Sequence, residues 1–474
     1  MSLCNFTLPF TPMKMLRSIS AFALLASLSA AQAPSKTTPR ARSRDGNAAI
    51  NAALRDVSAA RIRANIEKLA AFHTRHTLSS QDPAKNQIGA AHEWIFRELE
   101  KYSQACGGCL EVKKRSVMTQ PNRRIPQPTE IVNVYAILRG TDPEQAKRIY
   151  VVTGHYDSRA SDPMDANAQA PGANDDASGT AVSMECARVL SKHKFPATII
   201  FLAVAGEEQG LNGAANFAKM AKDEGWQIDA VLNNDIVGGN KSKEQDPSIV
   251  RVFSESIPGN ATEADVREIR GMGLENDSPS RQLARYIRET AKKYLTAAVP
   301  GVGNFGPKMI FRRDRFLRGG DHTAFNEQGF TAIRFTEYRE DYNRQHQNLR
   351  TENGIEYGDL PKFVDFDYVA NVARLNAAVL ASLASAPTAP KNVRVLTRQL
   401  ENDTTLTWDE VPGAAGYEIV WRPTTSSEWE NTEVVGNVTK ATLKRSKDNV
   451  HFAVRSVDRQ GNRSLPVIPK PLNQ

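Results

Sequence analysis

Between residues 48 and 386, short apolar runs alternate with longer segments in which apolar residues recur every three or four positions. The short runs predict buried β-strands, and the longer segments predict helices with one buried face. Nearly continuous apolar strands that alternate with helices are typical of an α/β fold, a largely parallel sheet sandwiched by helices. Strands are expected at 131–138, 149–153, 198–205, 230–235 and 331–336, and helices at 178–191, 214–223, 281–294 and 367–383.

The pattern changes after a Pro-rich linker at 385–392. The stretches "TTLTWDEV", "GYEIVWR" and "VHFAVRSV" are short, alternate apolar with polar residues, and are separated by turns, which predicts a small all-β sandwich at 388–474. The run "LTWDEVPGAAGYEIVWR" resembles a fibronectin type III domain, with Trp408 and Tyr417 at core positions. The sequence departs from that family at Val450, where a corner tyrosine is usual.

The N-terminal pattern is that of a secretory signal peptide. The stretch "MKMLRSISAFALLASLSAAQA" has basic residues, then an apolar run, then small residues with cleavage expected after Ala31 or Ala33. The apolar run is too short for a permanent membrane span. Residues 1–33 are therefore predicted to be a signal peptide and 34–47 a polar linker, so that the mature protein is secreted or periplasmic without stable membrane insertion.

Length and composition agree with a multidomain globular protein. The 474 residues exceed what one hydrophobic core usually supports, so two or three domains are expected, with the α/β domain at 48–386. The net charge is +8, but the basic residues are scattered among 53 acidic ones. No interleaved aromatic platform accompanies the clusters "VKKRS" and "IFRRDRFLR", which are interpreted as solvated faces, so no nucleic-acid partner is expected.

Cysteine usage fits an exported protein. Cys106 and Cys109 form the motif "CGGC", for which a disulfide that closes a short loop is favoured over a redox centre or half of a zinc site. No second cysteine pair or nearby histidine completes a zinc site in the sequence. Cys186 lies in the apolar pattern of a helix and is expected to be a buried thiol.

Polar side chains follow three of the expected strands, directly where each strand ends, in "GHYD", "GEEQG" and "NNDIVG". A Gly-rich loop with two adjacent aspartates, "PGANDDASGT", precedes the helix after the first of these strands. Sites in parallel α/β sheets form beyond the carboxyl ends of the strands, so these side chains are expected to meet at one edge. The residues placed there are His155, Asp157, Asp175, Asp176, Glu207, Glu208 and Asp235, and Asp321 and His346 follow in later motifs.

A cluster of His, Asp and Glu without Cys suits zinc in a catalytic site. A carboxylate that bridges two cations would explain the doubled aspartate, because the cation charge cancels the repulsion between neighbouring carboxylates. Each motif alone has a structural alternative: a buried histidine with satisfied hydrogen bonds, a helix start, or a capped turn. Their joint placement and order favour the metal site.

Six motifs in order between residues 133 and 349 resemble the co-catalytic di-zinc exopeptidases, the family of bacterial leucyl aminopeptidase and aminopeptidase Y: "GHYDS", "PGANDDASG", "AGEEQGLNGA", "NNDIVG", "GGDHTAF" and "YNRQHQ". The resemblance implies two zinc ions per chain, a cis peptide bond between Asp175 and Asp176, Glu207 as the catalytic glutamate and Asp157 as the carboxylate that orients a ligand. The implied ligands are His155, Asp175 and Asp235 for one ion and Asp175, Glu208 and His346 for the other, with Asp175 bridging.

The resemblance implies an exopeptidase, most readily an aminopeptidase acting on peptides with a free N-terminus. A carboxypeptidase is one alternative, because arginines at 312–318 could hold a terminal carboxylate. A glutaminyl cyclase on the same fold, with a single zinc ion, is another, and a non-catalytic binding protein is a third, although no implied ligand is missing. The sequence of the C-terminal domain indicates no partner for it.

Overall fold

The computed structural model describes residues 47–296, 304–398 and 400–472. The predicted signal peptide and all of the predicted linker except Asn47 lie outside these residues. No helix within the described ranges is long and apolar enough to cross a membrane.

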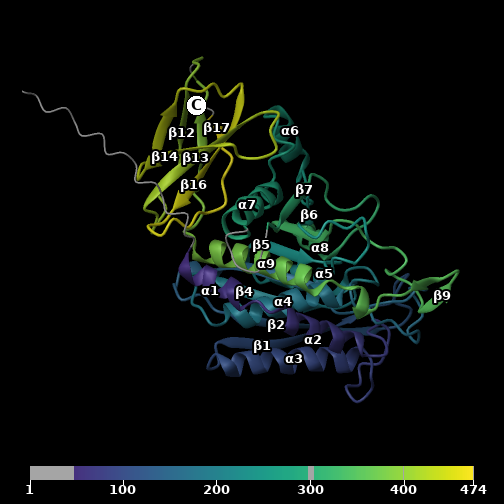
Figure 1. The fold of residues 1–474 in the computed structure, drawn as a ribbon. Coiled ribbons are helices and arrows are strands. Elements are labelled where there is room, and N and C mark those ends of the chain that lie inside the picture. The colour runs from purple at the N-terminus through teal and green to yellow at the C-terminus, as the bar shows by residue number, and fades with distance from the viewer. Residues whose placement is uncertain (1–46, 297–303, 399, 473–474) are drawn as a thin grey trace, which may run out of the picture. The chain divides into compact units, whose positions relative to one another are not determined.

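An eight-stranded sheet with the order β1-β2-β4-β3-β5-β8-β6-β7 forms the centre of the α/β part (Figure 1). The central neighbours β4, β3, β5 and β8 pair in parallel, as do β6 and β7, whereas β1–β2, β2–β4 and β8–β6 are antiparallel. The predicted α/β fold is confirmed, and its sheet is mixed toward both edges. The strands are β1 Leu110–Thr119, β2 Thr129–Leu138, β3 Arg148–His155, β4 Thr198–Val204, β5 Gln227–Asn234, β6 Ile249–Ser254, β7 Gly306–Ile310 and β8 Ala332–Glu337.

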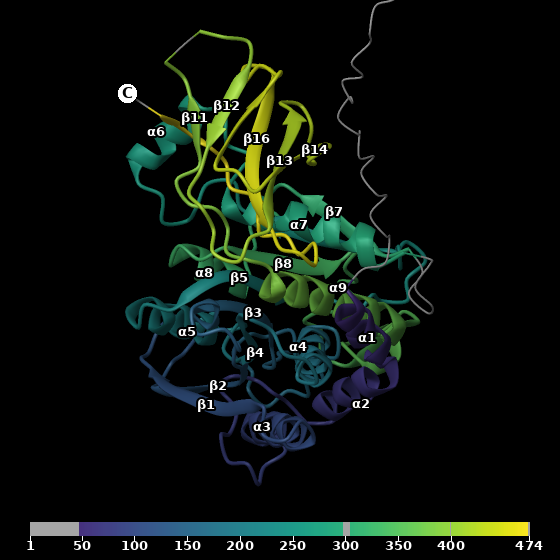
Figure 2. The same cartoon turned by 90° about the vertical axis from the view of Figure 1, so that its left-hand side faces the viewer.

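Helices cover both faces of this sheet, as the fully apolar strands require. In β4, Ile199 and Phe201 join the core that includes α4 and α9, whereas Ile200 and Leu202 join the core that includes α5 and α8. Figure 2 shows these two pairs of helices on opposite sides of the sheet. The helices are α1 Ala48–Asp56, α2 Ala59–Ala70, α3 Ile88–Ala105, α4 Ala177–Leu190, α5 Asn212–Asp223, α6 Glu263–Gly271, α7 Pro279–Tyr294, α8 Asp321–Glu327 and α9 Phe366–Ser385.

The start of α4 is fixed against the end of β5. The side chain of Asp176 caps the helix by accepting a hydrogen bond from the backbone N–H of Gly179 at 2.9 Å. A Cβ atom at Gly179 would lie 2.0 Å from the carbonyl oxygen of Asn234, so only glycine permits this approach. The contact brings the doubled aspartate to the carboxyl end of β5. The peptide bond between Asp175 and Asp176 is cis, as the resemblance implies.

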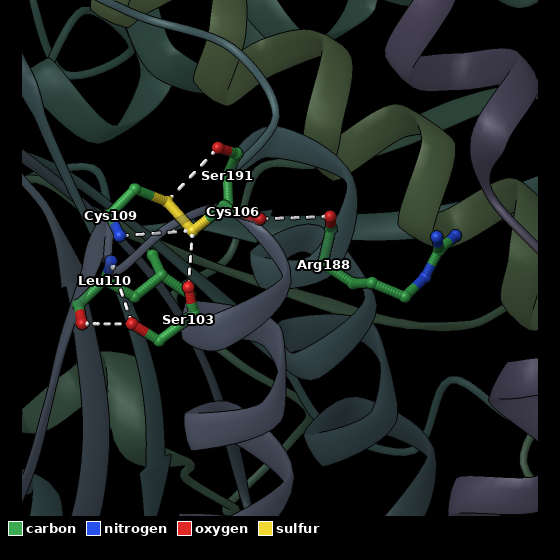
Figure 3. Close-up of a disulfide and its surroundings, with 6 residues drawn as sticks. All are labelled: Ser103, Cys106, Cys109, Leu110, Arg188 and Ser191. Carbon is green, nitrogen blue, oxygen red and sulfur yellow. Dashed lines mark hydrogen bonds between the residues drawn. A yellow bond between two sulfur atoms is a disulfide. The ribbon is translucent and has the colours of Figure 1, made fainter.

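Cys106 and Cys109 form a disulfide after the end of α3, which confirms the favoured interpretation of "CGGC" (Figure 3). The Sγ atom of Cys109 lies 3.2 Å from the carbonyl oxygen of Ser191, directly after α4. Ser103 donates a hydrogen bond to the carbonyl of Leu110 at 2.8 Å and so joins α3 to β1. The disulfide therefore lies where α3, β1 and the end of α4 meet. Cys186 is buried in α4, as expected.

The C-terminal strands form two small sheets, with the orders β15-β12-β11-β17 and β14-β13-β16, so the predicted all-β part is confirmed. Trp408 and Tyr417 lie in its core with ring centroids 5.4 Å apart, and the Tyr417 hydroxyl accepts a hydrogen bond from the Val411 N–H at 2.6 Å. The likeness to a fibronectin type III domain stays a prediction. The strands are β11 Arg394–Leu396, β12 Thr404–Thr407, β13 Gly416–Pro423, β14 Asn431–Gly436, β15 Lys440–Leu443, β16 Val450–Val457 and β17 Lys470–Leu472, and a hairpin of β9 Arg350–Glu352 and β10 Ile355–Tyr357 precedes α9.

Buried charges connect the small sheets to α7. Arg422 of β13 is 1% exposed, and its Nη2 atom lies 2.7 Å from Oδ2 of Asp277. The other oxygen of Asp277 pairs with Nη1 of Arg285 at 3.1 Å, and the indole of Trp429 donates to Gln282 at 3.0 Å. If the C-terminal strands are removed, Asp277 loses its ion pair with Arg422 but retains the one with Arg285.

A chain that ends at Ala386 is expected to fold but to be less stable than the full chain. It loses the hydrogen bond between Arg422 and Asp277, and a buried hydrogen bond to a charged group stabilises by about 1–3 kcal/mol. Thermal and denaturant unfolding of both chains measure this difference. A truncated chain without cooperative unfolding would contradict the predicted division into domains at 48–386 and 388–474.

Candidate metal centre

The ends of two neighbouring strands and the loop before α4 bring one histidine and two aspartates together. His155 is the last residue of β3, Asp235 follows β5, and Asp175 lies two residues before α4. Nε2 of His155 lies 3.1 Å from Oδ1 of Asp175 and 3.8 Å from Oδ1 of Asp235. All three side chains are buried. We refer to His155, Asp235 and Oδ1 of Asp175 as the His155 set.

A second group lies on the other side of the Asp175 carboxylate. Nε2 of His346 lies 2.9 Å from Oδ2 of Asp175 and 2.8 Å from Oε1 of Glu208. His346 has a left-handed backbone with φ of 54°, in the turn after β8. We refer to Glu208, His346 and Oδ2 of Asp175 as the His346 set. The two oxygens of one carboxylate thus face two different histidines, which is the arrangement of a bridging ligand.

Asp157 is fully buried and contacts His155, Glu208 and Thr77. Nδ1 of His155 lies 3.1 Å from the carbonyl oxygen of Asp157 and 3.4 Å from its Oδ1. Oδ2 of Asp157 accepts hydrogen bonds from the Glu208 N–H at 3.2 Å and from the Thr77 hydroxyl at 2.9 Å. This carboxylate orients the histidine and the segment after β4 together.

Glu207 lies beside the His155 set. His155, Glu207 and Asp235 each offer a ligand atom, and these atoms lie within 4.8 Å of one another. Burial raises the pKa of Glu207 well above its usual value, and the nearby carboxylates of Asp235 and Glu208 raise it further. In the absence of a cation, this carboxyl group is therefore held toward its protonated form.

The site carries more negative charge than its own side chains balance. Burial alone would lower the pKa of His346, but the carboxylates of Glu208 and Asp175 outweigh it and raise that pKa to about 10. Both oxygens of the buried Asp321 lack a hydrogen-bond partner, and burial raises its pKa to about 8. These shifts indicate an excess of carboxylates over cationic side chains, which bound cations would balance.

The donor atoms fit zinc. Each set offers one imidazole nitrogen and carboxylate oxygens, with no thiolate, which is the ligand chemistry of catalytic zinc sites. The bridging position of Asp175 fits two ions. The structure brings together the implied ligands, the implied catalytic glutamate and the orienting carboxylate: His155, Asp157, Asp175, Glu207, Glu208, Asp235 and His346. Their roles as ligands and base stay predictions. Asp176 accepts a hydrogen bond from the His155 N–H at 3.0 Å, and Asp321 is buried at the start of α8.

Three polar residues at the site were missed by sequence reasoning. Arg334 in β8 is fully buried, and its Nη2 lies 2.8 Å from Oδ1 of Asp235. Oδ2 of Asp359 accepts a hydrogen bond from the Asp175 N–H at 2.7 Å, and Arg159 contacts both Glu208 and His346. The sequence offers a sign of Arg334, because an arginine inside the apolar strand "TAIRFT" is unusual. No local pattern marks Asp359 or Arg159.

Comparisons with known proteins also point to a zinc-dependent peptidase. The model of peptidase family M28 matches residues 133–366. A probable zinc metalloprotease of Leptosphaeria maculans is 46% identical over 426 residues, which covers 89% of this chain and 97% of that protein. A probable zinc metalloprotease of Pyricularia oryzae is 45% identical, with 90% of this chain and 85% of that protein covered. Among solved structures, the LapA aminopeptidase of Legionella pneumophila superposes with a TM-score of 0.50 at 20% identity, over 71% of this chain and 74% of that one, which shows a shared fold.

Proposed function

The chain belongs to peptidase family M28. We propose that it is an exported aminopeptidase, which uses two bound zinc ions to remove N-terminal residues from peptides. The observation that carries this proposal is the Asp175 carboxylate, whose two oxygens face His155 at 3.1 Å and His346 at 2.9 Å. The N-terminal signal pattern and the disulfide between Cys106 and Cys109 support export.

The protein's own residues divide the work of peptide hydrolysis. Zinc, when bound, supplies Lewis-acid polarisation of the scissile carbonyl and makes water more acidic. Glu207 takes a proton from the attacking water and passes it to the leaving amine. Asp157 keeps that glutamate in reach, because its Oδ1 lies 3.4 Å from the Glu207 N–H and its Oδ2 lies 3.2 Å from the Glu208 N–H.

The charge of the site favours a substrate amine over a substrate carboxylate. Neither oxygen of the buried Asp321 has a hydrogen-bond partner among the described residues, and a substrate ammonium would supply a donor. Three of the four arginines at 312–318 that would serve a carboxypeptidase are engaged with acidic side chains. Arg315 lies 2.8 Å and Arg318 3.1 Å from Oε2 of Glu340, and Arg313 lies 3.0 Å from Glu327.

Blocking either end of a short peptide is expected to separate the two exopeptidase directions. An unblocked peptide and one with an amidated C-terminus should be cleaved at similar rates by the mature, zinc-loaded protein. An acetylated N-terminus should stop cleavage, because the amine is no longer available to the carboxylate-rich site. Product analysis by mass spectrometry records which end is shortened. If amidation blocks cleavage and acetylation does not, the protein is a carboxypeptidase and the proposal is wrong.

A further inference from the structure

Arg159 places a positive charge on the His346 set. Its Nε donates to Oε2 of Glu208 at 2.9 Å, and its Nη2 lies 2.7 Å from Nδ1 of His346. The remaining nitrogen makes only longer contacts, to the carbonyl of Ser161 at 3.3 Å and that of Ala160 at 3.5 Å. The side chain is 15% exposed, so its guanidinium has a route toward solvent.

The two histidines differ in what their Nδ1 atoms face. A neutral histidine that binds a metal through Nε2 carries a hydrogen on Nδ1, and that hydrogen is normally donated to a carbonyl or carboxylate. His155 meets this rule, because its Nδ1 lies 3.1 Å from the Asp157 carbonyl oxygen. His346 does not, because its Nδ1 faces Arg159, whose guanidinium has only donors.

Metal binding at the His346 set therefore works against Arg159. When an ion takes Nε2 of His346, the Nδ1–H and the Arg159 N–H point at each other, and the guanidinium has to move away. The ion would also be repelled by the Arg159 charge, whose Nε already donates to one oxygen of Glu208.

The His155 set also has an arginine, but of a different kind. Arg334 is fully buried and contacts the carboxylate of Asp235 at 2.8 Å. It is anchored by the carboxylate of Asp314 at 3.3 Å and the Gly319 carbonyl at 2.9 Å. Nδ1 of His155 keeps its carbonyl partner, as a zinc ligand requires. A donor that faces Nδ1 of the histidine is therefore specific to the His346 set.

We propose that Arg159 is a tethered cation that weakens zinc binding at the His346 set, so that this position exchanges its ion more readily than the His155 set does. The inference rests on the proposed two-zinc function. Arg159 would then set the fraction of enzyme molecules that carry both ions at a given zinc concentration.

Two substitutions at Arg159 test this role through metal affinity. Arg159→Gln removes the charge and offers a carbonyl oxygen to the Nδ1–H of His346. Arg159→Lys keeps the charge and can only donate. Titration of zinc-free protein against a competing chelator should show the weaker dissociation constant falling by roughly 10-fold or more in Arg159→Gln, the size of effect that groups contacting metal ligands exert. Arg159→Lys should leave it near the wild-type value.

The control is Arg139→Gln, a surface arginine whose partner Glu111 lies 2.6 Å away and which is unrelated to either set. Unchanged or weaker binding in Arg159→Gln, or an equal gain in Arg159→Lys, would overturn the inference. A second measurement does not depend on Arg159 variants: His346→Ala should abolish the weaker of the two wild-type dissociation constants, and loss of the tighter one would also overturn it. Two ions of equal affinity in the wild type would overturn the inference about Arg159 but leave the two-zinc proposal standing. A single ion bound at saturating zinc would instead contradict the two-zinc proposal itself.

Discussion

Glu207→Gln is expected to lower turnover on unblocked peptides by about 10²-fold or more, the range that removal of a general base reaches. The amide keeps the shape of the side chain but does not accept the proton from water. Zinc content should stay near the wild-type value, because neither the His155 set nor the His346 set contains Glu207. Turnover at saturating substrate and elemental analysis of the same preparation measure the two quantities.

The matched control is Glu224→Gln, an exposed glutamate at the end of α5, which should change neither quantity. Glu208→Gln provides the opposite pattern: it should lower zinc content, because Oε1 of Glu208 lies 2.8 Å from Nε2 of His346. If Glu207→Gln retains most of its activity while Glu208→Gln keeps its zinc, the adjacent glutamates have exchanged roles.

The sequence predicted the parts of the fold that local patterns encode. The strands β3, β4 and β5 are largely buried on both faces, so their presence and parallel arrangement could be inferred from the chain itself. The polar residues directly after them could be placed at one edge for the same reason. The limits of the three strands were less exact: β5 begins at Gln227, before the expected start at 230, because two of its first three residues, Gln227 and Asp229, are polar. The expected strands at 131–138 and 331–336 match β2 and β8 within two residues.

Other parts depend on contacts between distant segments, which no local pattern records. The backbone N–H of Asp175 is held by Asp359, 184 residues later, and His346 meets Arg159 across 187 residues. The antiparallel pairing of β8 with β6 makes the sheet mixed at one edge, and β6 has an arginine between its apolar residues. These contacts follow from the folded topology, so they had to be seen in three dimensions.

Asp175→Ala is expected to remove both zinc ions and with them nearly all peptidase activity, because each set loses one ligand in a single substitution. His155→Ala and His346→Ala should each weaken chiefly one ion, since each histidine contacts one oxygen of Asp175. Elemental analysis after dialysis against a weak chelator measures the ions retained. Asp223→Ala, in an exposed aspartate that pairs only with Lys219, is the control and should keep both.

The stability of the zinc-free protein distinguishes loss of a metal ligand from loss of the fold. Burial raises the pKa of Asp176 well above its usual value, and the carboxylates of Asp235 and Asp175 raise it further, so these groups repel one another without cations. Burial alone would raise the pKa of Asp175, but His346 and His155 outweigh it and hold that pKa well below its usual value, so this carboxylate stabilises the zinc-free fold. Zinc-free Asp175→Ala should therefore still unfold cooperatively, but at a lower temperature than the zinc-free wild type. The zinc-loaded wild type should unfold at a higher temperature than either, because ions that bind only the folded state stabilise it. A variant that still holds one ion as tightly as the wild type would show that Asp175 does not bridge, and the chain would then fit a single-zinc enzyme such as a glutaminyl cyclase.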